Sequence, residues 1–282
     1  MAAVGSWLFA RSAGGAWLVR MEDLDTPRVV SGAADDILRT LEWYGLTWDG
    51  EVVFQSRRTE AYEEALRILR IKDLLFPCAC TRSDLARAAS APDRSDAPEA
   101  GIYPGTCRTG LPPGRPARAF RFCVPAGVVH FDDIVFGSFS EDVAVSVGDF
   151  VVKRADGPYA YQLAVVVDDA GQRVTEVVRG ADLLDSTARQ IALQRALGLP
   201  IPAYAHLPLV LSPDGSKLGK RDGALPLAQQ DAARVRKTLA LALRILGLEP
   251  AEGSPQEMLG EALRHFSPRG VPRLSYRLSG PV

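Results

Sequence analysis

Apolar runs and helix-like periodic segments alternate over the first quarter of the chain. Residues 2–12 are apolar with helical spacing, and residues 16–21 form a nearly continuous apolar run of the kind buried in a parallel sheet. A periodic segment at 33–44, a second apolar run at 52–54 and another periodic segment at 60–74 follow. This order predicts an α/β fold with a mostly parallel sheet.

The pattern changes between residues 76 and 150. This segment holds all four cysteines, a stretch rich in Ala, Ser, Asp and Pro at 88–100, and short apolar runs at 119–148. Because glycine and acidic residues interrupt these runs, they indicate antiparallel strands. We interpret the segment as an inserted subdomain.

Three further apolar runs predict buried strands at 150–154, 161–167 and 174–179. A helix is expected from Asp185 or Ser186 to Leu197, then a buried strand from His206 and finally a helical tail. The predicted domain division is residues 1–75 and 151–235 for the core, 76–150 for the insert and 236–282 for the tail.

Composition restricts the function only a little. With 282 residues, of which 47% are hydrophobic, the chain can bury a sizeable core. Its net charge of −1 gives no overall basic surface, so a nucleic-acid partner would need a local patch. No apolar run reaches the roughly 18 residues of a membrane span, and we expect a soluble cytoplasmic protein.

Carboxylates follow the first predicted strand. Glu22 comes directly after the apolar run, and Asp23 and Asp25 follow it. Ligands of open α/β sheets bind at the carboxyl ends of the strands, so Glu22 is a candidate pocket residue. Asp23 and Asp25 could equally cap the turn before Pro27.

Arg179 ends another apolar run. A guanidinium there can hold a carboxylate or phosphate through two hydrogen bonds, although an arginine facing solvent is the alternative. Tyr161 is a second candidate, but a tyrosine in an apolar run is more often a core residue. The histidines, His130, His206 and His265, are far apart and indicate neither a metal site nor a general base.

A loop with two lysines follows the last predicted strand. Lys217 and Lys220 come after a turn at residues 213–215, with Gly219 between them. Two ammonium groups on such a loop can follow negative charge on a polyphosphate as it is broken. The alternative is a solvated hairpin tip.

The cysteines favour a metal site over a disulfide framework in a chain of this length. Cys78 and Cys80 lie two positions apart, and the chain can loop back to bring Cys107 beside them. Three thiolates and a fourth ligand suit a closed, structural zinc site. By composition Cys123 is the obvious fourth ligand, whereas Tyr103 would be unusual. The alternative is a set of buried, inert cysteines.

Several separate stretches together resemble the catalytic core of glutamyl-tRNA synthetases, class I enzymes with a Rossmann-type fold. The cysteine segment resembles the zinc-bearing insert of a short paralogous family, the glutamyl-Q tRNA(Asp) synthetases, which lack the helical anticodon-binding domain. The similarity covers nearly the whole chain. The stretches that carry it are Val19–Arg28, Tyr161–Asp169, Val178–Asp182 and Lys217–Arg221 for the core, and Cys78–Cys80 and Tyr103–Cys107 for the insert.

The resemblance implies activation of L-glutamate with ATP and Mg²⁺ as an adenylate. The glutamyl group would then pass to queuosine in the anticodon of tRNA(Asp). Glu22 would hold the amino group of glutamate, and Tyr161 and Arg179 its carboxylate end. Lys220 would be the catalytic contact to ATP, with Lys217 beside it.

The resemblance also implies one structural zinc ion and a monomer. Its ligands would be Cys78, Cys80, Tyr103 and Cys107, which leaves Cys123 as an ordinary buried thiol. This choice of tyrosine follows from the family and not from the chemistry of the residues.

The chain departs from the family in two places. Gly219 replaces a serine of the lysine loop, and the family's first strand and HIGH-type signature do not occur. We therefore expect weak or no glutamate-dependent ATP–pyrophosphate exchange. Two other functions stay open: a truncated glutamyl-tRNA synthetase that charges tRNA(Glu), and a catalytically impaired zinc-bearing RNA-binding paralogue.

Overall fold

The computed structural model describes residues 1–24, 29–89, 102–215 and 231–278. The helices are α1 (Ala2–Ser12), α2 (Ala33–Trp43), α3 (Thr59–Ile71), α4 (Arg82–Ala89), α5 (Val143–Ser146), α6 (Tyr161–Gly171), α7 (Thr187–Leu197), α8 (Ala232–Ile245) and α9 (Pro255–His265). Short 3₁₀ turns lie at Gln55–Arg57, Ala181–Ser186 and Pro268–Gly270. Across the described ranges, we find no helix with the length and apolar character needed to cross a membrane.

Within the described ranges, the strands form four small sheets. They are β1 (Arg20–Met21), β2 (Val53–Phe54), β3 (Leu75–Cys78), β4 (Ala119–Phe122), β5 (Val128–Asp133), β6 (Gly137–Asp142), β7 (Phe150–Lys153), β8 (Glu176–Gly180), β9 (Ala203–Leu207), β10 (Val210–Leu211) and β11 (Tyr276–Arg277). β1 pairs with β2 in parallel, and β10 with β11 likewise. β3, β4 and β7 form an antiparallel sheet, and the largest sheet has the order β6-β5-β9-β8.

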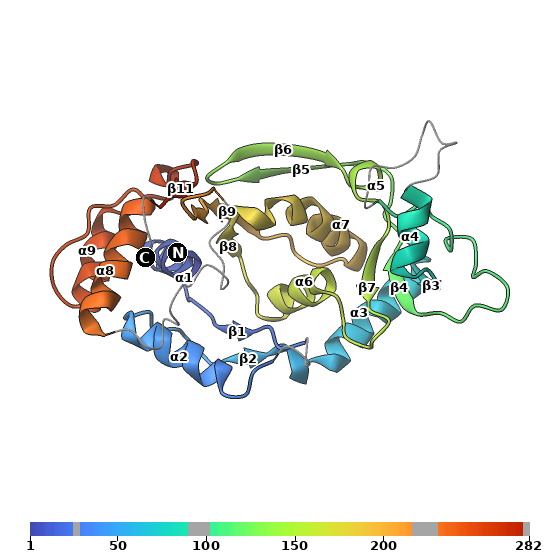
Figure 1. Ribbon diagram of the computed structural model, residues 1–282, viewed down its shortest axis with the longest axis horizontal. Coiled ribbons are helices and arrows are strands. Elements are labelled where there is room, and N and C mark those ends of the chain that lie inside the picture. Colours follow the sequence, from blue (N-terminus) through green and yellow to red (C-terminus); the bar gives the residue numbers. More distant parts are fainter. Residues whose placement is uncertain (25–28, 90–101, 216–230, 279–282) are drawn as a thin grey trace.

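The molecule is elongated (Figure 1). α8 and α9 lie with α1 at one end, and α4 lies with β3, β4 and β7 at the other. α6 and α7 occupy the middle, and the hairpin of β5 and β6 runs along one edge.

The parallel pairing predicted for the early strands is confirmed, although the strands are short. Only Arg20 and Met21 of the apolar run 16–21 form a ladder. The residues before them still follow the neighbouring segment, because the N–H of Asp49 donates to the carbonyl of Trp17 and that of Val53 to Val19. The run is therefore extended and paired along most of its length.

α6 corrects one prediction. The run at 161–167 is the first part of a helix and not a strand. Its successive residues Leu163, Ala164, Val165 and Val166 are all buried, because the helix packs inside the cluster formed with α3, α7 and β7. A helix covered on all sides has the same uninterrupted apolar sequence as a buried strand, so periodicity could not distinguish them.

Two large hydrophobic clusters hold the fold together. The first joins α1, α8 and α9 to strand residues such as Met21 and Leu207, and the second joins α3, α6 and α7 to β4 and β7. Leu239 and Leu243 are fully buried in the first cluster, as expected for the apolar face of the tail. Truncating such a leucine to alanine typically costs about 2–5 kcal/mol.

The helix α1 approaches β9 closely at Gly5. A Cβ atom added to Gly5 would lie 2.3 Å from Cδ1 of Leu207, a side chain that is only 1% exposed. The absence of a side chain at Gly5 thus sets the distance between helix and sheet.

The segment 76–150 contains the predicted antiparallel strands. β3 and β4 pair over four residues, and β5 and β6 form a hairpin. β5 also pairs with β9 in parallel, where Asp133 lies opposite Tyr204. The hairpin therefore belongs to the same sheet as β8 and β9, while the domain division itself stays a prediction.

Candidate substrate site and cysteine cluster

A cavity of about 650 Å³ is lined by residues of β1 and β8, which belong to different sheets. One wall is formed by residues 15–18 and Arg20, up to the first residue of β1, and the other by residues 173–178, which include the first three residues of β8. In the described part of the chain, β1 pairs only with β2 and β8 only with β9, so each strand has one unpaired edge. The charged side chains Arg20, Glu22 and Asp169 lie together in the lining of this cavity.

Arg20 connects the two carboxylates. Its Nη1 donates to Asp169 Oδ1 at 2.8 Å and to Gln172 Oε1 at 2.9 Å, and its Nη2 lies 3.5 Å from Glu22 Oε1. Burial raises the pKa of both Glu22 and Asp169, although Arg20 opposes the shift in each case. Two acidic groups thus share one arginine, which leaves the cavity with an excess of acidic groups.

Asp168 is not among the lining residues of this cavity, and it ties three elements together. It is fully buried, and its Oδ2 accepts hydrogen bonds from Gln55 Nε2 at 2.8 Å and Tyr62 Oη at 2.7 Å. The Nε of Arg58 donates to Oδ1. Because all three donors reach it from the segment 55–62, Asp168 fixes the start of α3 against α6. This is a structural role.

Arg179 on β8 is 8% exposed and is held by hydrogen bonds on several sides. Its Nη1 donates to Gln190 Oε1 at 2.7 Å, and its Nη2 to Thr187 Oγ1 at 2.9 Å and to the carbonyl of Leu183 at 3.3 Å. Its Nε donates to His206 Nε2 at 3.1 Å. The guanidinium is therefore buried and fixed, and the alternative of an arginine facing solvent is wrong.

Tyr161, at the start of α6, is affected by the charges of both Arg179 and the carboxylates. Burial raises its pKa most, Arg179 and a hydrogen bond with Gln190 lower it, and Glu22 and Asp169 raise it. Since Arg179 and Tyr161 share Gln190 as a partner, the structure brings these two predicted residues together. Glu22 lines the cavity, whereas Tyr161 and Arg179 are not among its lining residues.

Lys217 and Lys220 lie outside the described residues, and so does Asp25. Asp23 is described, and it accepts hydrogen bonds from the backbone N–H and the hydroxyl of Ser56 at 2.8 and 2.6 Å. Its carboxylate therefore connects the end of β1 to the turn after β2, a structural role that differs from the predicted cap of the turn before Pro27.

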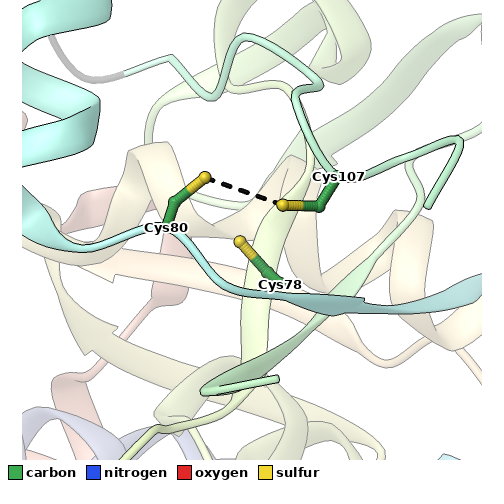
Figure 2. Close-up of side chains that lie close together, drawn as sticks. All are labelled: Cys78, Cys80 and Cys107. Atoms are coloured by element: carbon green, nitrogen blue, oxygen red, sulfur yellow. Dashed lines mark hydrogen bonds between the residues drawn. The ribbon is translucent and has the colours of Figure 1, made fainter. Parts of the chain in front are cut away.

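The thiols of Cys78, Cys80 and Cys107 point toward one another (Figure 2). All three sulfur atoms lie within 4.8 Å of one another, and those of Cys80 and Cys107 are 3.7 Å apart. The hydroxyl of Tyr103 lies 3.5 Å from the sulfur of Cys78 and 3.9 Å from that of Cys80. Around a tetrahedral zinc ion with bonds of about 2.3 Å, ligand sulfurs lie roughly 3.8 Å apart. The cluster thus has the dimensions of a metal site.

Cys123 is not a member of this group of thiols in the described chain. It packs against the cluster from β4's end, and burial raises the pKa of its thiol. Sequence composition favoured Cys123 over Tyr103 as the fourth ligand. The position of the Tyr103 hydroxyl favours tyrosine.

Arg121 was not predicted, and it contacts the cluster directly. Its Nε donates to the sulfur of Cys78 at 3.3 Å, and its Nη1 donates to the carbonyl of Asp149 at 2.9 Å. Although burial opposes ionisation, hydrogen bonds from Tyr103, the Cys80 backbone and Arg121 lower the pKa of Cys78. Burial and the neighbouring Cys107 raise the pKa of Cys80 to about 11. A metal ion would have to displace that proton.

Comparison with known proteins agrees with this architecture. Residues 1–261 match the family model of tRNA synthetases class I (E and Q), catalytic domain. The chain is similar to a crystal structure of a glutamate tRNA ligase from Elizabethkingia meningosepticum in complex with its amino acid, with a TM-score of 0.79 and 28% identity. That similarity covers 99% of this chain and 63% of the ligase. The fold and site therefore define the catalytic domain of a class I tRNA synthetase.

Individual relatives identify the family within this class of enzymes. A glutamyl-Q tRNA(Asp) synthetase of Geobacter sulfurreducens is 55% identical over 278 residues, which are 96% of this chain and 88% of the relative. A glutamyl-Q tRNA(Asp) synthetase of Aromatoleum aromaticum is 52% identical over 97% of this chain and 85% of the relative. The chain belongs to the glutamyl-Q tRNA(Asp) synthetase family.

Proposed function

We propose that this protein activates L-glutamate with ATP and transfers the glutamyl group to queuosine in the anticodon of tRNA(Asp). The names of relatives that are 55% and 52% identical over nearly the whole chain support this substrate pair. The family's reaction begins when the α-carboxylate of glutamate displaces pyrophosphate from ATP. We further propose that the protein acts as a cytoplasmic monomer.

The observation that carries the glutamate site is that charges of both signs act on Tyr161. Besides burial, which raises the pKa of this tyrosine most, Arg179 lowers its pKa and the carboxylates of Glu22 and Asp169 raise it. Glutamate offers an ammonium group and carboxylates, so a cation and carboxylates that act on one tyrosine would orient it. Glu22 takes the amino group in this arrangement, while Tyr161 and Arg179 take the carboxylate end.

ATP and Mg²⁺ complete the reactants in this proposal. Lys220 is the catalytic contact to the phosphates, with Lys217 beside it. A magnesium ion bound to the phosphates would neutralise part of their charge. Zinc is the ion proposed for Cys78, Cys80, Tyr103 and Cys107, where it would tie the end of β3 to the loop before β4.

The test is transfer of radiolabelled glutamate to purified tRNA in the presence of ATP and Mg²⁺. Three acceptors are compared: tRNA(Asp) with queuosine, the same tRNA without queuosine, and tRNA(Glu). We expect label only on the first. The three acceptors are compared with one enzyme sample. The preference among them therefore does not depend on the absolute rate of glutamyl transfer. Label on tRNA(Glu) would identify a glutamyl-tRNA synthetase instead.

A further inference from the structure

Asp133 and His206 form a buried pair directly behind Arg179. His206 lies on β9 opposite Arg179 of β8, and Asp133 is the last residue of β5 on the other side of β9. Asp133 is 3% exposed and His206 is 0% exposed. Asp133, His206 and Arg179 thus form one continuous line across three neighbouring parallel strands.

The hydrogen bonds determine which nitrogen of His206 carries the proton. The Nε of Arg179 is always a donor, so Nε2 of His206, 3.1 Å away, must accept. The proton of the neutral imidazole therefore sits on Nδ1, which lies 2.6 Å from Asp133 Oδ2. A carboxylate at that position is the acceptor that this tautomer requires.

Asp133 is itself held in place. Its Oδ1 accepts hydrogen bonds from the backbone N–H groups of Val135 at 3.0 Å and Phe136 at 2.8 Å. Burial opposes ionisation, but the hydrogen bonds from His206 and Phe136 lower the pKa of Asp133. The carboxylate therefore cannot rotate without breaking the turn after β5.

We propose that Asp133 and His206 are positioning residues that orient Arg179 for the carboxylate of glutamate, an inference that rests on the proposed function. Four of the five N–H groups of Arg179 have protein acceptors, so within the described chain one Nη1 proton remains for substrate. The sequence predicted two hydrogen bonds from Arg179 to the substrate, and only one donor remains for it. With one donor available, the orientation of the guanidinium decides the affinity for glutamate.

The variant Asp133→Asn separates positioning from packing. Backbone N–H groups hold the oxygen of the new amide at the Oδ1 position, so its NH₂ group faces Nδ1 of His206. That group donates, so the imidazole proton moves to Nε2, where it meets the Nε–H of Arg179. Asp132→Asn is the matched control, because Asp132 is the neighbouring residue on the exposed face and bonds only to Ser138 in the described chain.

Two measurements test the proposal. Long-range ¹H–¹⁵N spectra of histidine side chains report the tautomer, and the chain has only three histidines to assign. We expect His206 to carry its proton on Nδ1 in the parent and the Asp132→Asn protein, and on Nε2 in Asp133→Asn. We also expect KM for glutamate to rise roughly 10- to 100-fold in Asp133→Asn, with KM for ATP unchanged within about twofold.

The tautomer of His206 and the KM for glutamate distinguish failure of the positioning role from failure of the proposed function. An unchanged tautomer, or an unchanged KM for glutamate beside a changed tautomer, would overturn the positioning role. If the parent protein shows the Nδ1 tautomer but calorimetry detects no glutamate binding, the proposed function fails. A rise of both KM values in Asp133→Asn, matched by a lower melting temperature, would assign Asp133 to folding alone and would also overturn the proposal.

Discussion

The guanidinium of Arg121 lies 3.9 Å from the centre of the Tyr103 ring. The same side chain is only 8% exposed and donates to the sulfur of Cys78. A buried cation against a cluster of thiolates offsets their negative charge, and stacking on the ring holds Tyr103 in place. Arg121 therefore lies where it can influence the affinity of this cluster for a metal ion.

Arg121→Met should lower the affinity for zinc about 10- to 100-fold, because groups that orient metal ligands commonly contribute that much. Transfer of zinc to a chromophoric chelator measures the affinity directly. Arg118→Met is the control, since Arg118 is exposed and lies in the same segment. Equal zinc release from both variants would refute the role given to Arg121.

Two variants, Tyr103→Phe and Cys123→Ser, identify the fourth metal ligand. Tyr103→Phe removes the hydroxyl that lies 3.5 Å from the Cys78 sulfur, and it should weaken Co²⁺ binding and change the visible spectrum of the bound ion. Cys123→Ser should change neither, because Cys123 lies outside the group of thiols in the described chain. The opposite result would make Cys123 the ligand.

How much the sequence could predict differs between fold and site. The alternation of apolar runs and periodic segments correctly predicted α1, α2, α3 and the parallel pair β1 and β2. It failed at α6, because a helix that is buried on every side has no polar face. Without that face, the sequence lacks the alternation of apolar and polar positions that identifies a helix. Such a segment is defined by its neighbours in the fold and not by its own pattern.

The candidate site, too, could be predicted only in part from local sequence patterns. Glu22 and Arg179 could be proposed as site residues because each directly follows or ends an apolar run, a position where ligands bind in parallel sheets. His206 was dismissed because no other histidine lies near it, yet its partner is an aspartate 73 positions earlier. The pairing of β5 with β9 that joins them depends on tertiary structure, so no local spacing could have indicated it.

Gly5→Ala should destabilise the protein by about 1–3 kcal/mol, because the new methyl group would overlap Leu207 in a packed core. Gly260→Ala is a matched change within α9, where an added Cβ meets no atom within 4 Å. It should stabilise the protein by about 0.5–1 kcal/mol through helix propensity. Urea unfolding of both variants measures the difference, and a neutral Gly5→Ala would show that α1 can shift freely on β9.

Asp168→Ala should cost about 3–5 kcal/mol of unfolding free energy, since it leaves Arg58, Gln55 and Tyr62 without their shared acceptor. Asp156→Ala is the control. It removes half of an ion pair with Arg154 whose side chains are 55% and 39% exposed, and such pairs contribute little. Thermal melts of the two variants should therefore differ by several degrees. Similar melting temperatures would mean that water replaces the carboxylate of Asp168 at little cost.

Glu22→Gln should raise KM for glutamate roughly 10- to 100-fold, because a charge-assisted hydrogen bond to the substrate ammonium contributes about 1.5–3 kcal/mol. The variant keeps the size of the side chain and loses only its charge. Glu176→Gln is the matched control: Glu176 lines the same cavity from the opposite wall, and the proposed glutamate site does not include it. Glutamate-dependent pyrophosphate exchange measures both variants, and the KM for ATP should stay unchanged within about twofold in each. If Glu176→Gln raises KM for glutamate as much as Glu22→Gln does, the effect reflects the overall charge of the cavity and not a contact at Glu22.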